Sequence, residues 1–99
     1  MLPGFTSSSD KNTLGFYPLT TTATALAAWQ GPGPMAETPV HNHNYVELLF
    51  EQPANFTVPA SQTNSVRSRV GFNLTTFISA AGLKAPVRAN YWQVPSGST

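Results

Sequence analysis

The sequence predicts a mainly β protein, built as an antiparallel sheet, a sandwich or a small barrel of about five to seven short strands with little helix. Several segments alternate apolar and polar side chains. Seven glycines and nine prolines fall largely between those segments. No segment of about ten residues has a clear helical stripe. We therefore expect a single β domain over residues 1–99.

The first part of the chain predicts short strands separated by loops. Residues 1–11 are rich in Ser and Gly, and we expect a flexible arm. Residues 14–19 predict a short strand that Pro18 confines to a sheet edge. The segment 20–30 is ambiguous between helix and strand, but its Thr residues and alternating Ala residues favour a strand. The Pro and Gly cluster at 31–39 predicts a loop.

The second part predicts two strands with a connection and a tail. Residues 44–52 form one strand, followed by a connection over 53–62. A linker over 76–85 then leads to a strand over 86–94 and a polar tail over 95–99. In the first of these strands the side chains expected to face inward are Val46, Leu48 and Phe50, and those expected to face outward are Tyr45, Glu47 and Glu51.

Residues 64–76 separate most cleanly into two registers and predict a long central strand. The two faces are Val66, Val70, Phe72 and Leu74 against Arg67, Arg69, Asn73 and Thr75. The apolar face predicts sheet core. The polar face, which has two of the five basic residues of the chain, is expected to meet solvent or an anionic partner.

The composition favours assembly. Charged residues are 9% of the chain, against about 25% in an average domain, and the net charge is +1. A 99-residue chain is also marginal as an isolated fold. The absence of cysteine excludes disulfides and Cys-based metal or redox sites. We expect no signal peptide, no membrane span and no cofactor.

The sequence predicts no enzymatic activity. Glu47 and Glu51 would lie about 13 Å apart along an extended strand, too far for a close acid and base pair. The chain has no GxSxG nucleophile motif and no glycine loop of the kind that cradles phosphate.

A pattern of metal-ligand type occurs at His41, His43 and Glu47. These residues occupy alternate positions of an extended segment, so their side chains could converge on one ion. PVHNHNYVE resembles the first metal-binding motif of cupins, and VPASQTNSVR resembles the second, with Asn64 near the place of the expected histidine. Histidines that hydrogen bond locally or face solvent are the alternative. We predict that the chain binds no metal. If it did bind one, these three residues would be the candidate ligands.

Basic and polar residues also suggest a nucleic-acid surface. Arg67 and Arg69 share one face of the predicted central strand, and Arg88, Asn90 and Trp92 share one face of the last. Guanidinium groups, an amide and an aromatic ring on one sheet suit single-stranded or looped RNA. The alternative is a packed tryptophan with arginines that are solvated or paired with nearby carboxylates.

The order of these features resembles the coat proteins of small single-stranded RNA bacteriophages. The resemblance rests on an opening pair of short strands, a Pro and Gly loop, YVELLFEQP, SVRSRVGFNL and VRANYWQVP closing on SGST. It implies an antiparallel sheet whose inner face binds RNA, with Arg67, Arg69, Arg88 and Asn90 on that face. The two C-terminal helices of those coat proteins have no counterpart here.

We therefore predict a viral structural protein located in the virion, a self-assembling coat or capsid-associated subunit with nucleic acid on one sheet face. Its expected partners are further copies of itself or other virion proteins, with no membrane. One alternative is a decoration or surface-attachment protein that binds a preformed lattice. Another is a small cupin-like metal-binding protein.

Overall fold

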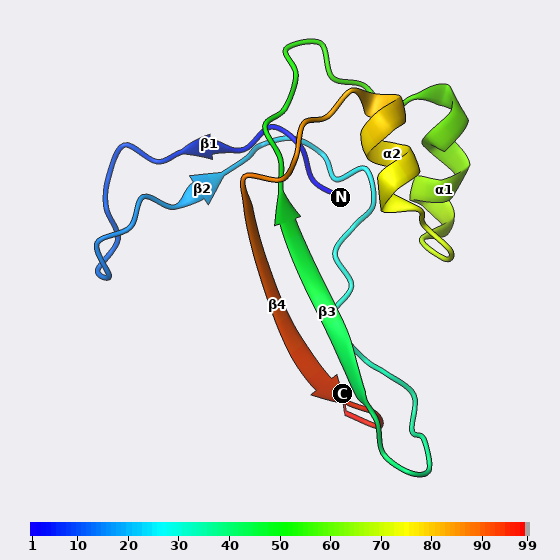
Figure 1. Ribbon diagram of the computed structural model, residues 1–99. Helices are drawn as coiled ribbons and strands as arrows, with labels where there is room; N and C mark the ends of the chain where they lie inside the picture. Colours follow the sequence, from blue (N-terminus) through cyan, green and yellow to red (C-terminus); the bar gives the residue numbers. More distant parts are fainter. Residues whose placement is uncertain (99) are drawn as a thin grey trace.

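A computed structural model describes residues 1–98, and their strands form two separate antiparallel sheets (Figure 1). The elements in chain order are β1 (Thr6–Ser7), β2 (Leu19–Thr20), β3 (Asn42–Leu49), a 3-10 turn (Ala60–Gln62), α1 (Thr63–Ser68), α2 (Leu74–Ala81) and β4 (Arg88–Pro95). The prediction of a small, mostly non-helical antiparallel fold is confirmed. The predicted sandwich or barrel of about five to seven strands is not formed by these residues, because β1 pairs only with β2 and β3 only with β4.

Strands β3 and β4 confirm the strands predicted at 44–52 and 86–94. They pair in one register, from Asn42 opposite Pro95 to Leu49 opposite Arg88. Residues directly opposite each other share a face of an antiparallel sheet. The two faces are therefore the His43 face (His43, Tyr45, Glu47, Leu49, Arg88, Asn90, Trp92 and Val94) and the Val46 face (Asn42, Asn44, Val46, Leu48, Ala89, Tyr91, Gln93 and Pro95).

The predicted inward and outward facing of this strand is reversed at its centre. Val46 was expected in the core, yet it is 61% exposed. Tyr45 was expected to face outward, yet it is half-buried. Tyr45 stacks on Trp92, and the neighbouring loop extends Glu37 to His43 on the same face. Alternation identifies two faces but does not say which of them other segments will cover.

The predicted central strand over 64–76 is wrong, because two helices occupy this stretch. Helix α1 ends at Ser68, and the next residue, Arg69, caps it with a left-handed backbone of φ 64°. Helix α2 begins at Leu74, and the side chain of the preceding Asn73 caps it by accepting a hydrogen bond from Thr76 N at 3.0 Å. Gly82 follows its last residue in a left-handed conformation. The helical spacing of apolar residues in α2 continues beyond residue 76, where the predicted strand ended. The predicted strand therefore included only the first part of this helix.

The strand predicted over 20–30 is also wrong beyond Thr20. Thr21 Oγ1 donates to Pro3 O at 2.7 Å and accepts from Ala23 N at 3.1 Å. These local side-chain bonds replace a strand ladder. Met1 N, in the segment predicted as an arm, donates to Ala27 O at 2.8 Å. Burial lowers the pKa of this amino group, and the charge of Arg69 lowers it further.

The loop predicted over 31–39 is confirmed, and the predicted polar tail begins inside β4. Ser96 N in that tail donates to His41 O at 2.7 Å, and Gly97 N donates to Pro34 O at 2.9 Å. The tail is therefore bonded to the segment that leads into β3. Its last residue, Thr99, lies outside the described residues.

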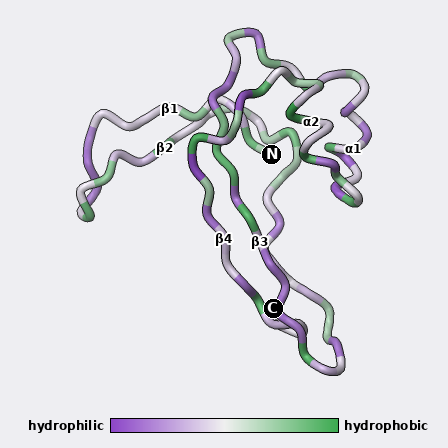
Figure 2. Tube along the Cα trace, in the orientation of Figure 1, coloured by the Kyte–Doolittle hydropathy of each residue, from purple (hydrophilic) through white to green (hydrophobic). Residues whose placement is uncertain are grey.

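The hydrophobic core of the described residues is small. Val66 and Phe77 are its buried apolar side chains, and the ring of Phe77 lies 5.4 Å from that of Phe72. Figure 2 shows hydrophobic residues gathered where the N-terminal segment, β3 and α2 meet. Neither helix of the described residues has the length and apolar character needed to cross a membrane.

Candidate functional site

A cavity of about 710 Å³ lies between the N-terminal segment, β3 and α2. We call it the arm–sheet cavity. Its walls are mainly apolar and include Leu2, Phe5, Leu48, Phe50, Phe72 and Phe77. Its polar side chains include Glu51 and Gln52, and Gln52 Oε1 already accepts a hydrogen bond from Gly4 N at 2.8 Å. This lining gathers no acid and base pair.

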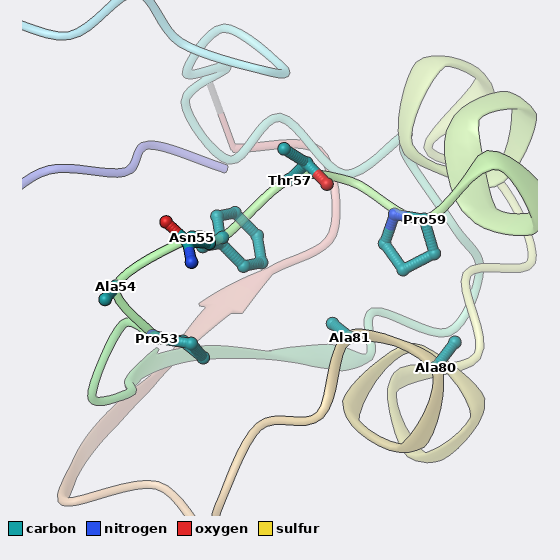
Figure 3. Close-up of a pocket in the computed structure, with 8 residues that line it drawn as sticks. Pro53, Ala54, Asn55, Thr57, Pro59, Ala80 and Ala81 are labelled. Atoms are coloured by element: carbon teal, nitrogen blue, oxygen red, sulfur yellow. The ribbon is translucent and has the colours of Figure 1, made fainter.

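A second, smaller cavity of about 510 Å³ lies between the connection 53–59 and the end of α2 (Figure 3). Pro53, Pro59, Ala80 and Ala81 are among its lining residues. The polar side chains of its lining are those of Asn55 and Thr57, and none of its lining residues is charged. It therefore lacks side chains for proton transfer, whereas the lining of the arm–sheet cavity has the single carboxylate of Glu51.

The titratable chemistry lies instead on the His43 face of the β3–β4 sheet. His43 Nε2 is 3.1 Å from Glu37 Oε2, within hydrogen-bonding distance. Both side chains are about two-fifths exposed, at 40% and 41%. The strand therefore fixes an imidazole at the surface, and the preceding loop supplies the carboxylate that orients its ring.

An aromatic pair lies next to this histidine on the same face. Tyr45 and Trp92 are directly opposite in the register, and their ring centroids are 5.9 Å apart with an interplanar angle of 20°. Tyr45 follows His43 by two positions, and Trp92 is its diagonal neighbour across the strands. Such neighbours are within reach of aromatic side chains. Imidazole, carboxylate and aromatic rings are thus gathered in one small area.

The predicted nucleic-acid residues separate into two groups. Arg88 and Asn90 lie on the His43 face with Trp92, in the arrangement that the sequence predicted for β4. Arg88 Nη1 donates to Val87 O at 2.7 Å. Arg67 lies in α1 and Arg69 at its end, and α1 makes no contact with β4 among the described residues. No single basic surface therefore gathers all four.

The predicted metal ligands are not gathered either. His43 and Glu47 share a face, with Glu47 opposite Asn90. His41 precedes β3, and its backbone N donates to Ser96 Oγ at 3.1 Å. Within residues 1–98 no group of three His, Cys, Asp or Glu side chains is placed to hold an ion. The candidate cupin-like set therefore remains dispersed.

Two contributors to the His43 face were missed in the sequence. Glu37 lies in the loop six positions before His43, where no periodic pattern relates the two residues. The opposition of Tyr45 and Trp92 depends on pairing two distant strands. The available signal for that pairing was the presence of aromatic residues in both predicted strands, Tyr45 in one and Trp92 in the other.

The chain is similar to two curated fungal proteins, both named Phomoidride biosynthesis cluster protein N. One, from a fungal species, is 47% identical over 57 residues, covering 54% of this chain and 26% of the relative. The other, from Talaromyces stipitatus, is 36% identical over 70 residues, covering 67% of this chain and 34% of the relative. The chain thus spans about a quarter to a third of the length of these relatives. No protein-family model matches it, and no solved structure is similar to it.

These similarities overturn the interpretation as a bacteriophage coat protein. The relatives are named for a fungal biosynthesis cluster, not for a virion. The predicted capsid role, the lattice-binding alternative and the virion location are therefore wrong. The resemblance rested on the order of features, and its longest feature, the strand over 64–76, is two helices.

Proposed function

We propose that this chain is part of a small-molecule-binding protein of fungal secondary metabolism, and that the His43 face contributes to its binding site. The observation that carries this proposal is the pairing of His43 with Glu37 beside the Tyr45–Trp92 stack. The names of the two relatives supply the biosynthetic context.

The chemistry of the face selects a ligand with an anionic group and a flat unsaturated body. In the imidazolium form both ring nitrogens of His43 donate, so Nδ1–H is available to a ligand while Nε2–H stays on Glu37. A charge-assisted hydrogen bond of this kind favours a carboxylate. The rings of Tyr45 and Trp92 offer an apolar surface for an unsaturated body on the same face of the sheet as this imidazole.

We propose binding without a bond-making step by this chain. His43 is paired with a carboxylate and not with a hydroxyl or thiol nucleophile. The second carboxylate of the face, Glu47, is four positions along β3 and opposite Asn90. At about 13 Å along the strand it is too far from His43 to share one small reacting group.

Fluorescence titration with cinnamate tests the site, because this probe joins a carboxylate to a flat unsaturated body. Trp29→Phe leaves Trp92 as the single tryptophan reporter. In that background cinnamate should quench Trp92, whereas cinnamyl alcohol, which lacks the charge, should bind at least about tenfold more weakly. His43→Ala should abolish this preference for the acid.

His41→Ala is the matched control, since His41 contributes its backbone and not its ring to the bonds with Ser96. It should leave the cinnamate affinity unchanged. Equal losses in the two histidine variants, or equal affinities for the acid and the alcohol, would reject the site. Mass spectrometry of the molecules that the protein retains from an extract of Talaromyces stipitatus tests the claim that this chain makes no bond, because a binding protein returns its ligands chemically unchanged.

A further inference from the structure

The described fold exposes far more solvent-accessible surface than is expected for a compactly folded protein of the same mass. A protein of 10.6 kDa is expected to expose about 5,500 Å² when folded compactly, whereas this chain exposes 7,688 Å². Its radius of gyration is 15.9 Å, against about 13 Å for a compact chain of similar length. The surplus, about 2,200 Å², is on the scale of an obligate interface.

Two of the exposed large hydrophobic residues, Val46 and Tyr91, lie on the Val46 face. Val46 and Tyr91 are directly opposite each other, and they are 61% and 67% exposed. The four cross-strand pairs on this side of the sheet have no charged side chain, from Asn42 with Pro95 to Leu48 with Ala89. The opposite side has His43, Glu47 and Arg88. An uncharged face of this kind is typical of a surface that another layer covers.

The Val46 face is continuous with the arm–sheet cavity. Val46 and Leu48 line that cavity together with Phe5 and Phe77. Its size and apolar walls match a core from which one layer is absent, since native interiors leave few voids larger than a water molecule. The sheet that forms its wall has two strands, and among residues 1–98 each of them pairs only with the other, so no further strand pairs with either outer edge. A two-stranded sheet is marginal in water without further strands or a covering layer.

We propose that the Val46 face and the arm–sheet cavity are an interface filled by polypeptide corresponding to the part of the two relatives that this chain does not match. The matched residues make up 26% and 34% of those relatives, so each has enough further chain to supply a covering layer. A layer that pairs with the outer edges of β3 and β4 would also enlarge the sheet. The Val46 face lies on the side of the sheet opposite His43, Tyr45 and Trp92, and the residues that line the arm–sheet cavity include none of these three.

A matched pair of substitutions tests the interface in two settings. Val46→Asp introduces a charge on the proposed interface, and Val70→Asp introduces the same charge at a residue that is 85% exposed between α1 and α2. The settings are the 99-residue chain alone and the Talaromyces stipitatus relative with its matched segment replaced by this chain. In the chain alone both substitutions should have similar small effects on the melting temperature.

In the chimera Val46→Asp should lower the melting temperature by about 5 °C or more, because it buries an unpaired charge, and Val70→Asp should not. Equal shifts for the two substitutions in the chimera would overturn the proposal.

A second experiment uses the chain alone and does not depend on the chimera folding. It measures the radius of gyration by X-ray scattering and the molecular mass by light scattering. An extended monomer is expected. A compact monomer with a radius of gyration near 13 Å, or a dimer that Val46→Asp dissociates, would each overturn the proposal, the dimer in favour of a second copy.

Discussion

Tyr45 and Trp92 stack across the β3–β4 sheet, with their ring centroids 5.9 Å apart, although the two residues are distant in the sequence. Their contact forms only in the observed register of the two long strands, because a shift by one residue would move every side chain of one strand to the other face. The same register places His43 beside the rings and leaves Val46 on the opposite face. One aromatic contact thus joins the fold to the candidate site.

We expect Tyr45→Ala and Trp92→Ala to be energetically coupled. A double-mutant cycle by urea denaturation should give an interaction free energy of about 0.5–1.5 kcal/mol, the range for stacked aromatic pairs. The control cycle combines Tyr45→Ala with Tyr17→Ala, which lies outside the β3–β4 sheet. Its coupling should not exceed about 0.5 kcal/mol. Equal coupling in the two cycles would show that the stack does not stabilise the sheet.

Phe77→Ala should be among the most destabilising single substitutions in this chain. The side chain of Phe77 is 2% exposed and packs on Phe72, so truncation leaves a cavity and should lower the free energy of unfolding by about 3–5 kcal/mol. Phe16→Ala removes the same atoms at a residue that is 67% exposed and should change that free energy by less than about 0.5 kcal/mol. Comparable losses in both variants would contradict the location of the core.

Asn73→Ala should weaken the start of α2. The Asn73 side chain accepts the backbone N–H of Thr76, and loss of such a cap lowers the free energy of unfolding by about 1 kcal/mol. Asn73→Asp keeps the acceptor and should restore most of that loss. Asn64→Ala, inside α1, is the control and should be neutral or slightly stabilising, because Ala favours helix. Denaturation midpoints of the three variants test this order.

Gly82→Ala isolates a backbone effect at the end of α2. Gly82 has φ 65°, and an added Cβ would meet no atom within 4 Å, so the cost arises from the left-handed conformation alone. We expect a loss of about 1 kcal/mol in the free energy of unfolding. Gly31→Ala also meets no atom within 4 Å, and Gly31 is not among the glycines with positive φ. That control should be neutral or stabilising, and a loss equal to that of Gly82→Ala would contradict the assignment.

The sequence determined β3 and β4 because alternation with a period of two is local, and the Pro and Gly loop before β3 is equally local. The helix α2 also had local signals, Asn73 before its first residue and Gly82 after its last. The alternation of Val70, Phe72 and Leu74 across the turn has the period of a strand, and this pattern led to the strand prediction in place of the helix. A short apolar run fits both periods, and its neighbours in space decide between them.

The candidate site was predicted in fragments. His43, Glu47, Arg88 and Asn90 were singled out for metal or nucleic acid, and the register places them on one face. Their grouping depends on pairing strands separated by the whole helical segment, and Glu37 approaches His43 through the path of a loop. Such contacts have no local period that a sequence could display.

The sequence by itself determined which segments alternate and where the chain turns, since backbone preference and side-chain periodicity act over a few residues. The tertiary structure alone decided that Tyr45 meets Trp92, that His43 meets Glu37 and that Val46 remains exposed. The physical reason is that alternation gives every strand two faces, whereas burial depends on which distant segment packs against each face.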